Sequence, residues 1–568
     1  MDNQRILLFF ALSFILLLLW QAWQQDYGAP ARQAPSQTPA ATGVDTGTAT
    51  GADAPQASAT PPADVPAPTA GTPAGDAPAA PRLVMQDVLK KGERIRVVTD
   101  VLDVEIDTRG GDLRQADLLA YPVSTDEPDK PFRLMEDGKL RVFIAQSGLL
   151  SPQGAPDHHS DYRALQREYR LAPDADELRV PLVWESDNGI KVTKTYVFRR
   201  DSYVVEVEHK VENGSSQPWQ GHQYRQFQRT EPTDAEKSFL LYTYTGGVIY
   251  SPEEKYEKID FDDMRDADLS RNILGGWAAM IQHYFVGAWI PDQEETNHFY
   301  TKAPENRPYV LGLVSPPRLV EPGASTVFSS RLFVGPKEQQ RLKEVAEGLE
   351  LTVDYGILTF LAKPLFWLLD YINRLIGNWG WSIVVLTLLI KLAFYKLSEA
   401  SYRSMANMRR LHPKITALRE RYGDDRQRMS QAMMELYKKE KINPLGGCLP
   451  MLVQIPVFIA LYWVLLESVE LRQAEFILWI KDLSTRDPYY ILPILMGATM
   501  YIQQKLNPPP PDPIQAKVLM ALPFIFTLFF AFFPSGLVLY WVANSILSIL
   551  QQWYIMRRIE KAAAAAKS

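Results

Sequence analysis

Three patterns of hydrophobic and polar residues follow one another along the 568-residue chain. Near the start, an apolar run extends from Ile6 to Trp20 and leads into a stretch rich in Ala, Pro, Thr and Gly. From about residue 82 to 345, apolar and polar residues alternate, as they do in half-buried β-strands. Beyond about residue 350, long apolar runs return. The pattern therefore predicts a β domain between an N-terminal anchor and a helical membrane region.

Residues 1–24 are predicted to form an uncleaved transmembrane anchor. A single cation, Arg5, precedes the apolar run, and no small-residue cleavage site closes it. Trp20 and Trp23 suit the aromatic belt at a membrane surface. A cleaved signal peptide is the alternative. Residues 25–81 almost lack large apolar side chains, so they are predicted to be a disordered tether stiffened by proline.

Residues 82–345 are predicted to form one large antiparallel β-sandwich. Apolar residues occupy every second position over much of 190–198 and again over 205–211, and residues 200–202 can turn between the two runs. Such a pair reads as a β-hairpin with one face in water. Similar short runs recur along the region, separated by Gly, Pro, Asn and Asp.

Five strongly apolar segments in the C-terminal half are predicted to be transmembrane helices. They cover residues 381–397, 449–467, 490–505, 518–533 and 536–555. The preceding segment, residues 346–380, has apolar positions at helical spacing, a polar side, and Pro364 in its middle. It could be a further span or an amphipathic helix lying at the external surface of the membrane.

The distribution of cations decides between these two alternatives. The loop from Lys396 to Cys448 carries twelve Lys and Arg against six Asp and Glu. If residues 354–376 crossed the membrane, this loop and the basic tail at 556–568 would be external, against the positive-inside rule. An interfacial helix at 346–380 instead leaves six spans, including 6–23, with both termini and the basic loop in the cytoplasm. The β domain then lies on the external side.

Residues 398–445, within the basic loop, are predicted to form an amphipathic helical hairpin. Apolar side chains recur every three or four residues on both sides of a turn at residues 422–425. One interpretation is a connector that packs on itself. The other is a docking arm, because methionines give an adaptable surface and cations suit acidic partners or lipid headgroups. The residues in question are Met405, Met408, Arg409, Arg410, Met429 and Met433.

The sequence argues against an enzyme. Neither a histidine nor an aspartate pair falls within a predicted span, and the chain contains no HExxH, P-loop or CxxC motif. A protease, an ATPase, a metal and a cofactor are therefore not expected. Ion-coupled transport has weak support, because proton relays normally use carboxylates deep in the membrane. His158, His159, His209 and His222 could suggest sugar chemistry, but scattered histidines on a β surface are usually ordinary polar residues.

Lys391 lies well inside the apolar segment 381–397, where a charge costs at least about 2.5–3.5 kcal/mol near a helix centre. It could extend to the inner membrane surface, donate a structural hydrogen bond, or line a wet cavity. Thr387 lies one turn earlier on the same helix face. Gln454 and Ser545 fall in other predicted spans, with Asn544 and Ser548 beside Ser545. A polar patch shared by several spans indicates a hydrated recess that could receive polar or acidic peptide.

Two segments carry a family resemblance. NPLGGCLPMLVQIPVFIALYWVLLESVEL and FFPSGLVLYWVANSILSILQQW resemble the YidC membrane-protein insertases, and the similarity extends over about residues 350–560. The anchor, tether and β domain match the long Gram-negative type in layout. The resemblance implies a non-enzymatic insertase of the bacterial inner membrane that inserts nascent proteins alone or beside the Sec translocon. A solute transporter or channel with an external sugar-binding domain is the alternative.

The resemblance also implies roles for particular positions. The five-helix core would form a groove open to the cytoplasm and to lipid, with Lys391 as its charge. Thr387, Gln454 and Ser545 would be its polar residues. Clients would contact Ile455, Pro456, Tyr540 and Trp541. The helical hairpin would recruit clients or signal-recognition targeting factors, and the basic tail would help to dock ribosomes. The periplasmic domain would resemble the mutarotase-like supersandwich and contact Sec accessory proteins. No direct role with nucleic acid is expected.

Overall fold

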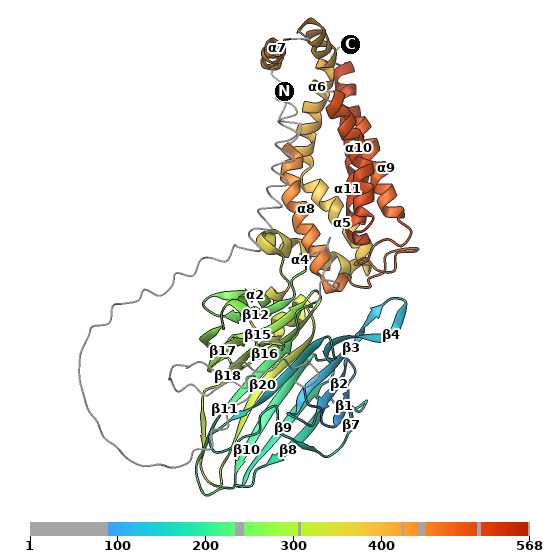
Figure 1. The fold of residues 1–568 in the computed structure, drawn as a ribbon. Coiled ribbons are helices and arrows are strands. Elements are labelled where there is room, and N and C mark those ends of the chain that lie inside the picture. Colours follow the sequence, from blue (N-terminus) through green and yellow to red (C-terminus); the bar gives the residue numbers. More distant parts are fainter. Residues whose placement is uncertain are drawn as a thin grey trace, which may run out of the picture.

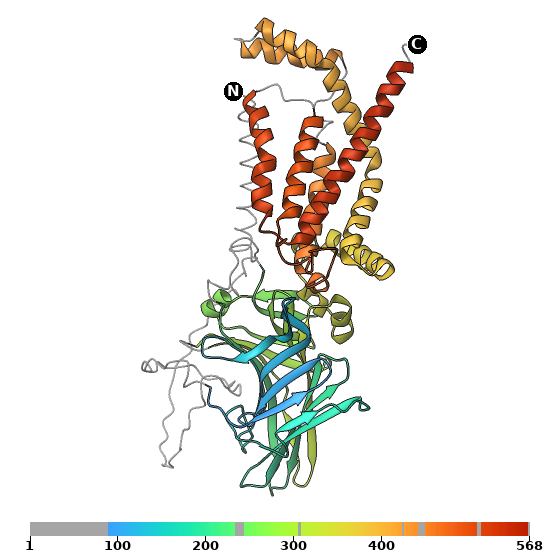
Figure 2. The same cartoon turned by 90° about the vertical axis from the view of Figure 1, so that its right-hand side faces the viewer.

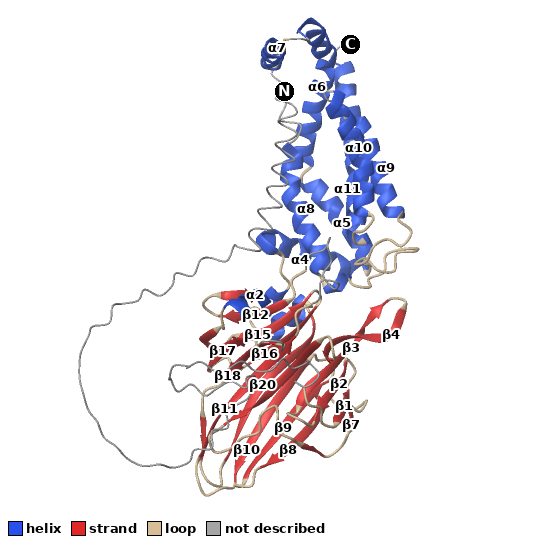
Figure 3. Ribbon diagram, viewed as in Figure 1, coloured by secondary structure: helices blue, strands red, loops and turns tan. Residues whose placement is uncertain are grey.

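The computed structural model describes residues 89–232, 243–304, 308–422, 425–440, 449–507 and 513–565. The predicted anchor at 1–24 and tether at 25–81 lie outside the described residues. The described residues form a β domain with a helical bundle standing on one end of it (Figure 1). Figure 3 shows that the strands are confined to the β domain and that nearly all helices lie outside its sheets, toward the bundle.

Two large, mainly antiparallel sheets make up the described β domain, as predicted for a β-sandwich. The eleven-stranded sheet contains, in spatial order, β14 (Ser270–Leu274), β17 (Thr296–Lys302), β18 (Tyr309–Val314), β11 (Trp219–Arg229), β5 (Val142–Leu150), β4 (Glu127–Asp137), β3 (Asp112–Ser124), β2 (Leu102–Asp107), β1 (Arg94–Val98) and β7 (Glu168–Arg170), with β19 (Arg318–Val320) paired to β11. The nine-stranded sheet contains β13 (Lys255–Ile259), β12 (Gly246–Ser251), β15 (Trp277–Gln282), β16 (Phe285–Ile290), β20 (Ser325–Pro336), β10 (Val204–Asn213), β9 (Ile190–Arg199), β8 (Glu177–Glu185) and β6 (Arg163–Ala164).

The hairpin predicted between residues 190 and 211 is confirmed as β9 and β10. Val205 lies opposite Phe198 and Val207 opposite Tyr196, and all four side chains are buried. Asp201 turns the chain between the strands with a φ of 51°, a left-handed conformation that aspartate tolerates better than most residues. The period-two pattern therefore identifies both the strands and the face that enters the core.

Lys194 lies on the apolar face of β9, between Val192 and Tyr196, and is fully buried. Its Nζ atom donates hydrogen bonds to the carbonyl oxygens of Gly110 at 3.0 Å and Ser147 at 2.8 Å. Burial lowers the pKa of Lys194 to about 8, because the charged form loses its hydration. The alternating pattern did not reveal this buried cation, because both carbonyl groups are distant in sequence.

His158 and His209, two of the histidines noted in the β domain, are buried and hydrogen-bonded. The Nδ1 atom of His158 lies 2.6 Å from the Tyr224 hydroxyl group, and Gln223 Nε2 donates to His209 Nδ1 at 2.9 Å. Burial lowers the pKa of His209, so its ring stays neutral. Among the described residues, no group of three His, Cys, Asp or Glu side chains could hold a metal ion. These two histidines satisfy buried polar groups of the sandwich.

The helical region follows β20 along the chain. Its helices are α3 (Gln339–Val345), α4 (Thr359–Ile376), α5 (Trp379–Ala393), α6 (Tyr395–Tyr422), α7 (Arg426–Lys439), α8 (Leu449–Glu467), α9 (Ile491–Leu506), α10 (Pro513–Phe530) and α11 (Ser535–Ala565). One short helix, α2 (Phe261–Asp266), belongs to the β domain. Helices α8 to α11 coincide closely with four of the five apolar segments of the sequence.

By length and hydropathy, no single helix in the described part of the chain meets the criteria for crossing a membrane. Helix α5 and the first part of α6 (Tyr395–Leu411) meet them only as a pair, and the two are bent by 67° at the break between them. Shorter apolar stretches occur at Val453–Glu467 and Ala516–Phe530. The segment 381–397 therefore contains a bend after α5, which the apolar pattern alone did not indicate.

Helix α4 lies across the direction of the bundle helices, between them and the β domain (Figure 2). One side is buried through Ala362, Leu365 and Leu369, whereas Trp367 and Tyr371 on another side are exposed and stacked at 5.9 Å. Helix α4 is therefore amphipathic, with one buried apolar side and one exposed aromatic side.

The end of α8 is held against the β domain by a buried ion pair. Lys337, directly after β20, places its Nζ atom 3.3 Å from Oε2 of Glu467, the last residue of α8. Both side chains are almost fully buried. Nearby, His283 Nε2 donates to the Leu466 carbonyl oxygen at 2.9 Å. Burial lowers the pKa of His283 to about 3, so this ring is neutral at ordinary pH.

Strand β3 contacts the loop that follows α8. Arg472 donates to the Pro122 carbonyl oxygen at 2.6 Å, and its guanidinium group lies 5.5 Å from the centre of the Phe285 ring. In the same loop, Oε2 of Glu470 is buried without a hydrogen-bond partner among the described residues. Burial, and secondarily the charge of Glu338, raise the pKa of Glu470 to about 7. Polar contacts thus join the β domain to the helical bundle.

Candidate functional site

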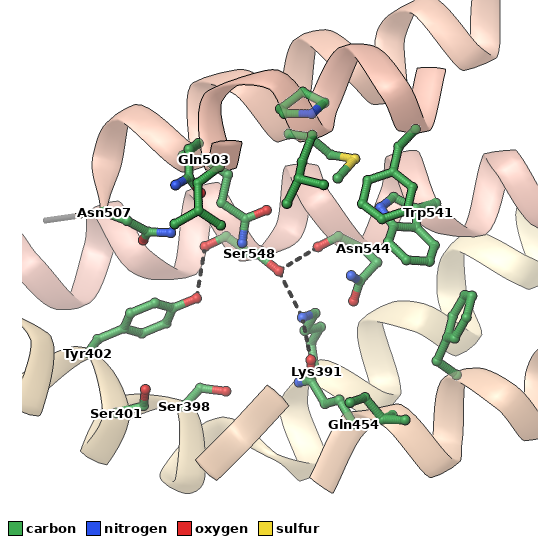
Figure 4. Close-up of a pocket in the computed structure, with 18 of the residues that line it drawn as sticks. Lys391, Ser398, Ser401, Tyr402, Gln454, Gln503, Asn507, Trp541, Asn544 and Ser548 are labelled. Atoms are coloured by element: carbon green, nitrogen blue, oxygen red, sulfur yellow. Dashed lines mark hydrogen bonds between the residues drawn. The ribbon is translucent and has the colours of Figure 1, made fainter. Parts of the chain in front are cut away.

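A cavity of about 540 Å³ lies within the helical bundle, lined by residues of α5, α6, α8, α9, α10 and α11. Figure 4 shows its polar side chains pointing toward one another from these helices. Lys391 is the only charged side chain among the described residues that line it. The cavity therefore combines one cation with neutral hydrogen-bonding groups and apolar walls.

Lys391 stands in the last turn of α5 and points into the bundle, with 7% of its surface exposed. Its Nζ atom donates to Ser548 Oγ at 2.8 Å and to Gln454 Oε1 at 3.4 Å. Ser548 can accept this bond because its own hydroxyl group donates to the Asn544 carbonyl oxygen at 2.7 Å. Neutral acceptors hold the ammonium group, so its positive charge is not cancelled by any lining carboxylate.

Three polar residues were predicted around Lys391, and the structure brings one of them, Gln454, into the cavity lining. Thr387 and Ser545 are buried, but neither lines the cavity. Thr387 donates to the carbonyl oxygen of Ile383 in its own helix at 2.6 Å. On α11, Asn544 and Ser548 are one turn apart and face the cavity, and Ser545 is rotated about 100° from Asn544 around the helix. Of the polar patch predicted from the sequence, Gln454, Asn544 and Ser548 line the cavity, whereas Thr387 and Ser545 do not.

An aromatic wall bounds part of the cavity. Tyr540 and Trp541, both predicted client contacts, line it together with Phe458. The rings of Phe458 and Trp541 meet edge to face, with centres 4.6 Å apart. Ile455 also lines the cavity and is 44% exposed, whereas Pro456 is exposed outside the lining. The predicted client surface thus lies partly within the cavity and partly on the outer face of α8.

Several lining residues were not predicted. Tyr402 comes from α6, where its hydroxyl group donates to the Ser548 carbonyl oxygen at 3.5 Å. Gln503, Gln504 and Asn507 come from the end of α9. The only sequence signal for this last group is a cluster of amides at the end of an apolar run, which is also typical of a helix leaving the membrane. Their convergence with α5 and α11 depends on the tertiary packing.

Helices α6 and α7 occupy the region predicted as a helical hairpin, and α7 projects sideways from the end of the bundle opposite the β domain (Figure 2). Lys414 of α6 and Glu440 after α7 form an ion pair at 2.6 Å. Arg409 and Arg410 are exposed. The four methionines predicted to face partners are half-buried: Met405, Met408, Met429 and Met433. Met405 also lines the cavity.

Two family models cover nearly all of the described chain. Residues 94–368 match the YidC periplasmic domain, and residues 371–562 match the 60Kd inner membrane protein family. A protein of Thioalkalivibrio sulfidiphilus described as "Membrane protein insertase YidC" is 56% identical over 573 residues, and the match covers 99% of each chain. A protein of Methylococcus capsulatus with the same description is 54% identical, and the match covers 100% of each chain.

Two similar solved structures complete the comparison. One is titled "Active YidC insertase crystal structure with the first transmembrane domain resolved"; it is 19% identical with a TM-score of 0.40, and the match covers 82% of this chain and 93% of that chain. The other is a galactose mutarotase related enzyme from Lactobacillus acidophilus, 11% identical with a TM-score of 0.29, covering 42% of this chain and 97% of that chain. From the full-length sequence matches, this chain belongs to the YidC family of membrane protein insertases.

Proposed function

We propose that this protein inserts inner-membrane proteins into the bilayer through the cavity around Lys391. The observation that carries the insertase function is the full-length match to relatives named as membrane protein insertases. Insertion moves a polypeptide from water into lipid and makes or breaks no covalent bond, so the protein is not an enzyme. The cavity, with one unneutralised cation in a helical bundle, supplies a route for the polar part of a client.

The proposed topology has six membrane spans. The segment 6–23 forms the first, and segments 381–397, 449–467, 490–505, 518–533 and 536–555 form the other five. Helix α4 lies at the periplasmic surface of the membrane, and the β domain lies in the periplasm. Both termini, α7 and the basic part of α6 lie in the cytoplasm, in agreement with the positive-inside rule. The arrangement in Figure 1 supports this, because α7 and the β domain are at opposite ends of the bundle.

In this mechanism, the client's external tail first enters the cavity from the cytoplasmic side. A carboxylate about 4 Å from Lys391 Nζ gains about 4 kcal/mol at an effective dielectric constant of about 20. Loss of hydration offsets part of that gain, so the interaction remains transient. The polar lining shortens the apolar distance that the tail must cross, and Lys391 favours tails that carry acidic residues.

The client's apolar segment then moves into lipid along the faces of α8 and α11 that carry Ile455, Tyr540 and Trp541. Transfer of apolar surface out of water supplies about 25 cal/mol per Å². The membrane potential adds about 2.3 kcal/mol per acidic charge for each 100 mV. These two terms drive insertion without a nucleotide.

The partners of the insertase are proposed from its surfaces. The exposed cations Arg409 and Arg410, beside adaptable methionines, suit signal-recognition targeting factors, clients or acidic lipid headgroups. The basic C-terminal tail suits ribosomes. The Sec translocon and its accessory proteins are the proposed partners of the bundle and the periplasmic domain.

Reconstitution into liposomes tests the proposal. The purified protein alone is combined with a one-span client that carries a short acidic external tail, and protection of that tail from protease is measured. We expect protection above that of empty liposomes. We expect Lys391→Ala to lower the insertion rate about tenfold, corresponding to ~1.4 kcal/mol. Lys396→Ala is the matched control, because Lys396 is five residues away and exposed. Equal insertion by wild type and Lys391→Ala for every client would refute the role of the charge.

A further inference from the structure

Three side-chain amides in the cavity have no partner within the described part of the chain. Gln503 and Gln504 of α9 and Asn544 of α11 line the cavity, and none of their amide groups makes a hydrogen bond there. The other two amides of the lining are engaged. Gln454 accepts from Lys391, and Asn507 accepts from Gln552 Nε2 at 3.3 Å. Free and engaged amides therefore occur in the same cavity.

Gln503 and Asn544, two of the free amides, lie on different sides of the cavity. In Figure 4, Gln503 and Asn507 are on the side away from Lys391, whereas Asn544 lies close to Lys391 and Trp541. All three free side chains are half-buried. The free amides thus extend the polar surface of the cavity beyond the reach of Lys391.

The backbone of a client tail requires hydrogen-bond acceptors, which Lys391 cannot supply. Each non-proline residue of an extended tail carries one N–H donor and one C=O acceptor. Leaving such a group unpaired away from water costs several kcal/mol in hydrocarbon. An ammonium group only donates, so Lys391 can bind carboxylates and carbonyl oxygens but cannot accept from a backbone N–H group. A primary amide both donates and accepts.

We propose that Gln503, Gln504 and Asn544 bind the peptide backbone of the client's translocating tail and so permit the insertion of tails without acidic residues. This inference rests on the proposed insertase function. It divides the cavity into two recognition elements. Lys391 binds acidic side chains, and the amides bind the backbone of an extended tail. An acidic tail is also held by Lys391, so it depends less on the amides than a neutral tail does. Client specificity then depends on which element a given tail uses.

The test compares two clients that differ only in the external tail. One tail contains acidic residues, and in the other these are replaced by their amide counterparts. Both are added to liposomes that contain wild type, Lys391→Gln or the double variant Gln503→Leu/Gln504→Leu. Leucine has about the size of glutamine and cannot form hydrogen bonds. Gln551→Leu is the matched control, because Gln551 lies on α11 outside the cavity lining.

We expect the double variant to insert the neutral tail about five- to tenfold more slowly than wild type, the effect of losing two hydrogen bonds. We expect Lys391→Gln to slow the acidic tail by a larger factor than the neutral tail. Asn544→Leu should slow the neutral tail by a smaller factor. A general loss of folding would instead slow both clients equally.

Three outcomes would overturn the inference. They are unchanged insertion of the neutral tail by the double variant, an equal loss for both tails, and the same loss in Gln551→Leu. Failure of wild-type protein to insert the acidic tail is a separate result, because it contradicts the proposed function itself. If wild-type protein inserts the client with the acidic tail but not the client with the neutral tail, only the proposed role of the amides is contradicted.

Discussion

Glu470 makes the stability of the junction between the β domain and the bundle dependent on pH. Its Oε2 atom is buried without a hydrogen-bond partner in the described chain. The negative charges of Glu338 and Asp370 also repel the ionised form of its carboxyl group. Burial and these charges raise its pKa from 4.5 to about 7. The Glu470→Gln substitution keeps the shape and removes the charge, so it isolates this effect.

The sign and size follow from linkage. Because the pKa is raised on folding, the folded junction binds the proton more tightly than the unfolded chain. Stability is therefore highest below about pH 4.5 and falls as the pH rises to about 7. The difference of about 2.5 units corresponds to about 3 kcal/mol. Glu470→Gln should stabilise the junction by up to this amount at pH 8 and by little at pH 4.5.

Hydrogen exchange of the full-length protein in detergent measures the effect locally. The backbone amides of residues 468–472 and of α3 report opening of the junction. At pH 8, Glu470→Gln should raise their protection factors about a hundredfold relative to wild type. Glu475→Gln is the control, because Glu475 is an exposed residue of the same loop, paired with Lys481 at 3.4 Å. Other groups that titrate at the junction are present in both proteins and cancel in the comparison.

A result of equal protection in wild type and Glu470→Gln at pH 8 would refute this reasoning. It would mean that Glu470 reaches water in the folded protein. A stabilisation of the same size at pH 4.5 and pH 8 would also refute it, because the gain would then not come from removing a charge.

Two further predictions concern packing. Lys337→Met should destabilise the protein by about 3–5 kcal/mol, because it leaves Glu467 buried and unpaired. In thermal unfolding, the double variant Lys337→Met/Glu467→Met should recover most of this lost stability. A double variant as unstable as Lys337→Met would contradict the argument. Gly497→Ala should destabilise by about 1–3 kcal/mol, because a Cβ atom there would lie 1.9 Å from Thr527 Oγ1 between α9 and α10. Adding Thr527→Ala should restore the melting temperature, and failure to restore it would show that another contact limits the packing.

The sequence was informative wherever a local period decides the structure. Alternation identified β9 and β10, and apolar runs located α8 to α11, because burial of one face or of a whole helix leaves a repeating signal. The break between α5 and α6 left no such signal. The apolar run continues through Ala393 and Phe394, so hydrophobicity alone does not mark the bend.

The site was predictable in kind but not in detail. A lysine in an apolar run indicated a polar recess, since a charge there is costly without one. Choosing Ser545 over Ser548 required knowing the rotation of α11 about its axis, and each residue turns the helix by about 100°. The buried Lys194 shows the same limit in the β domain, because its carbonyl partners lie 84 and 47 residues away in sequence.

The junction at α8 also bears on how such a protein can be recombined. The two family models meet between residues 368 and 371, which is inside α4. The contacts of Lys337 with Glu467 and of Arg472 with Pro122 both cross that boundary. A chimera that joins the periplasmic domain of one relative to the bundle of another at this point would therefore divide a helix and take the two partners of this buried ion pair from different proteins. The exchangeable unit is the periplasmic domain together with α4, Glu467 at the end of α8, and the loop that follows it.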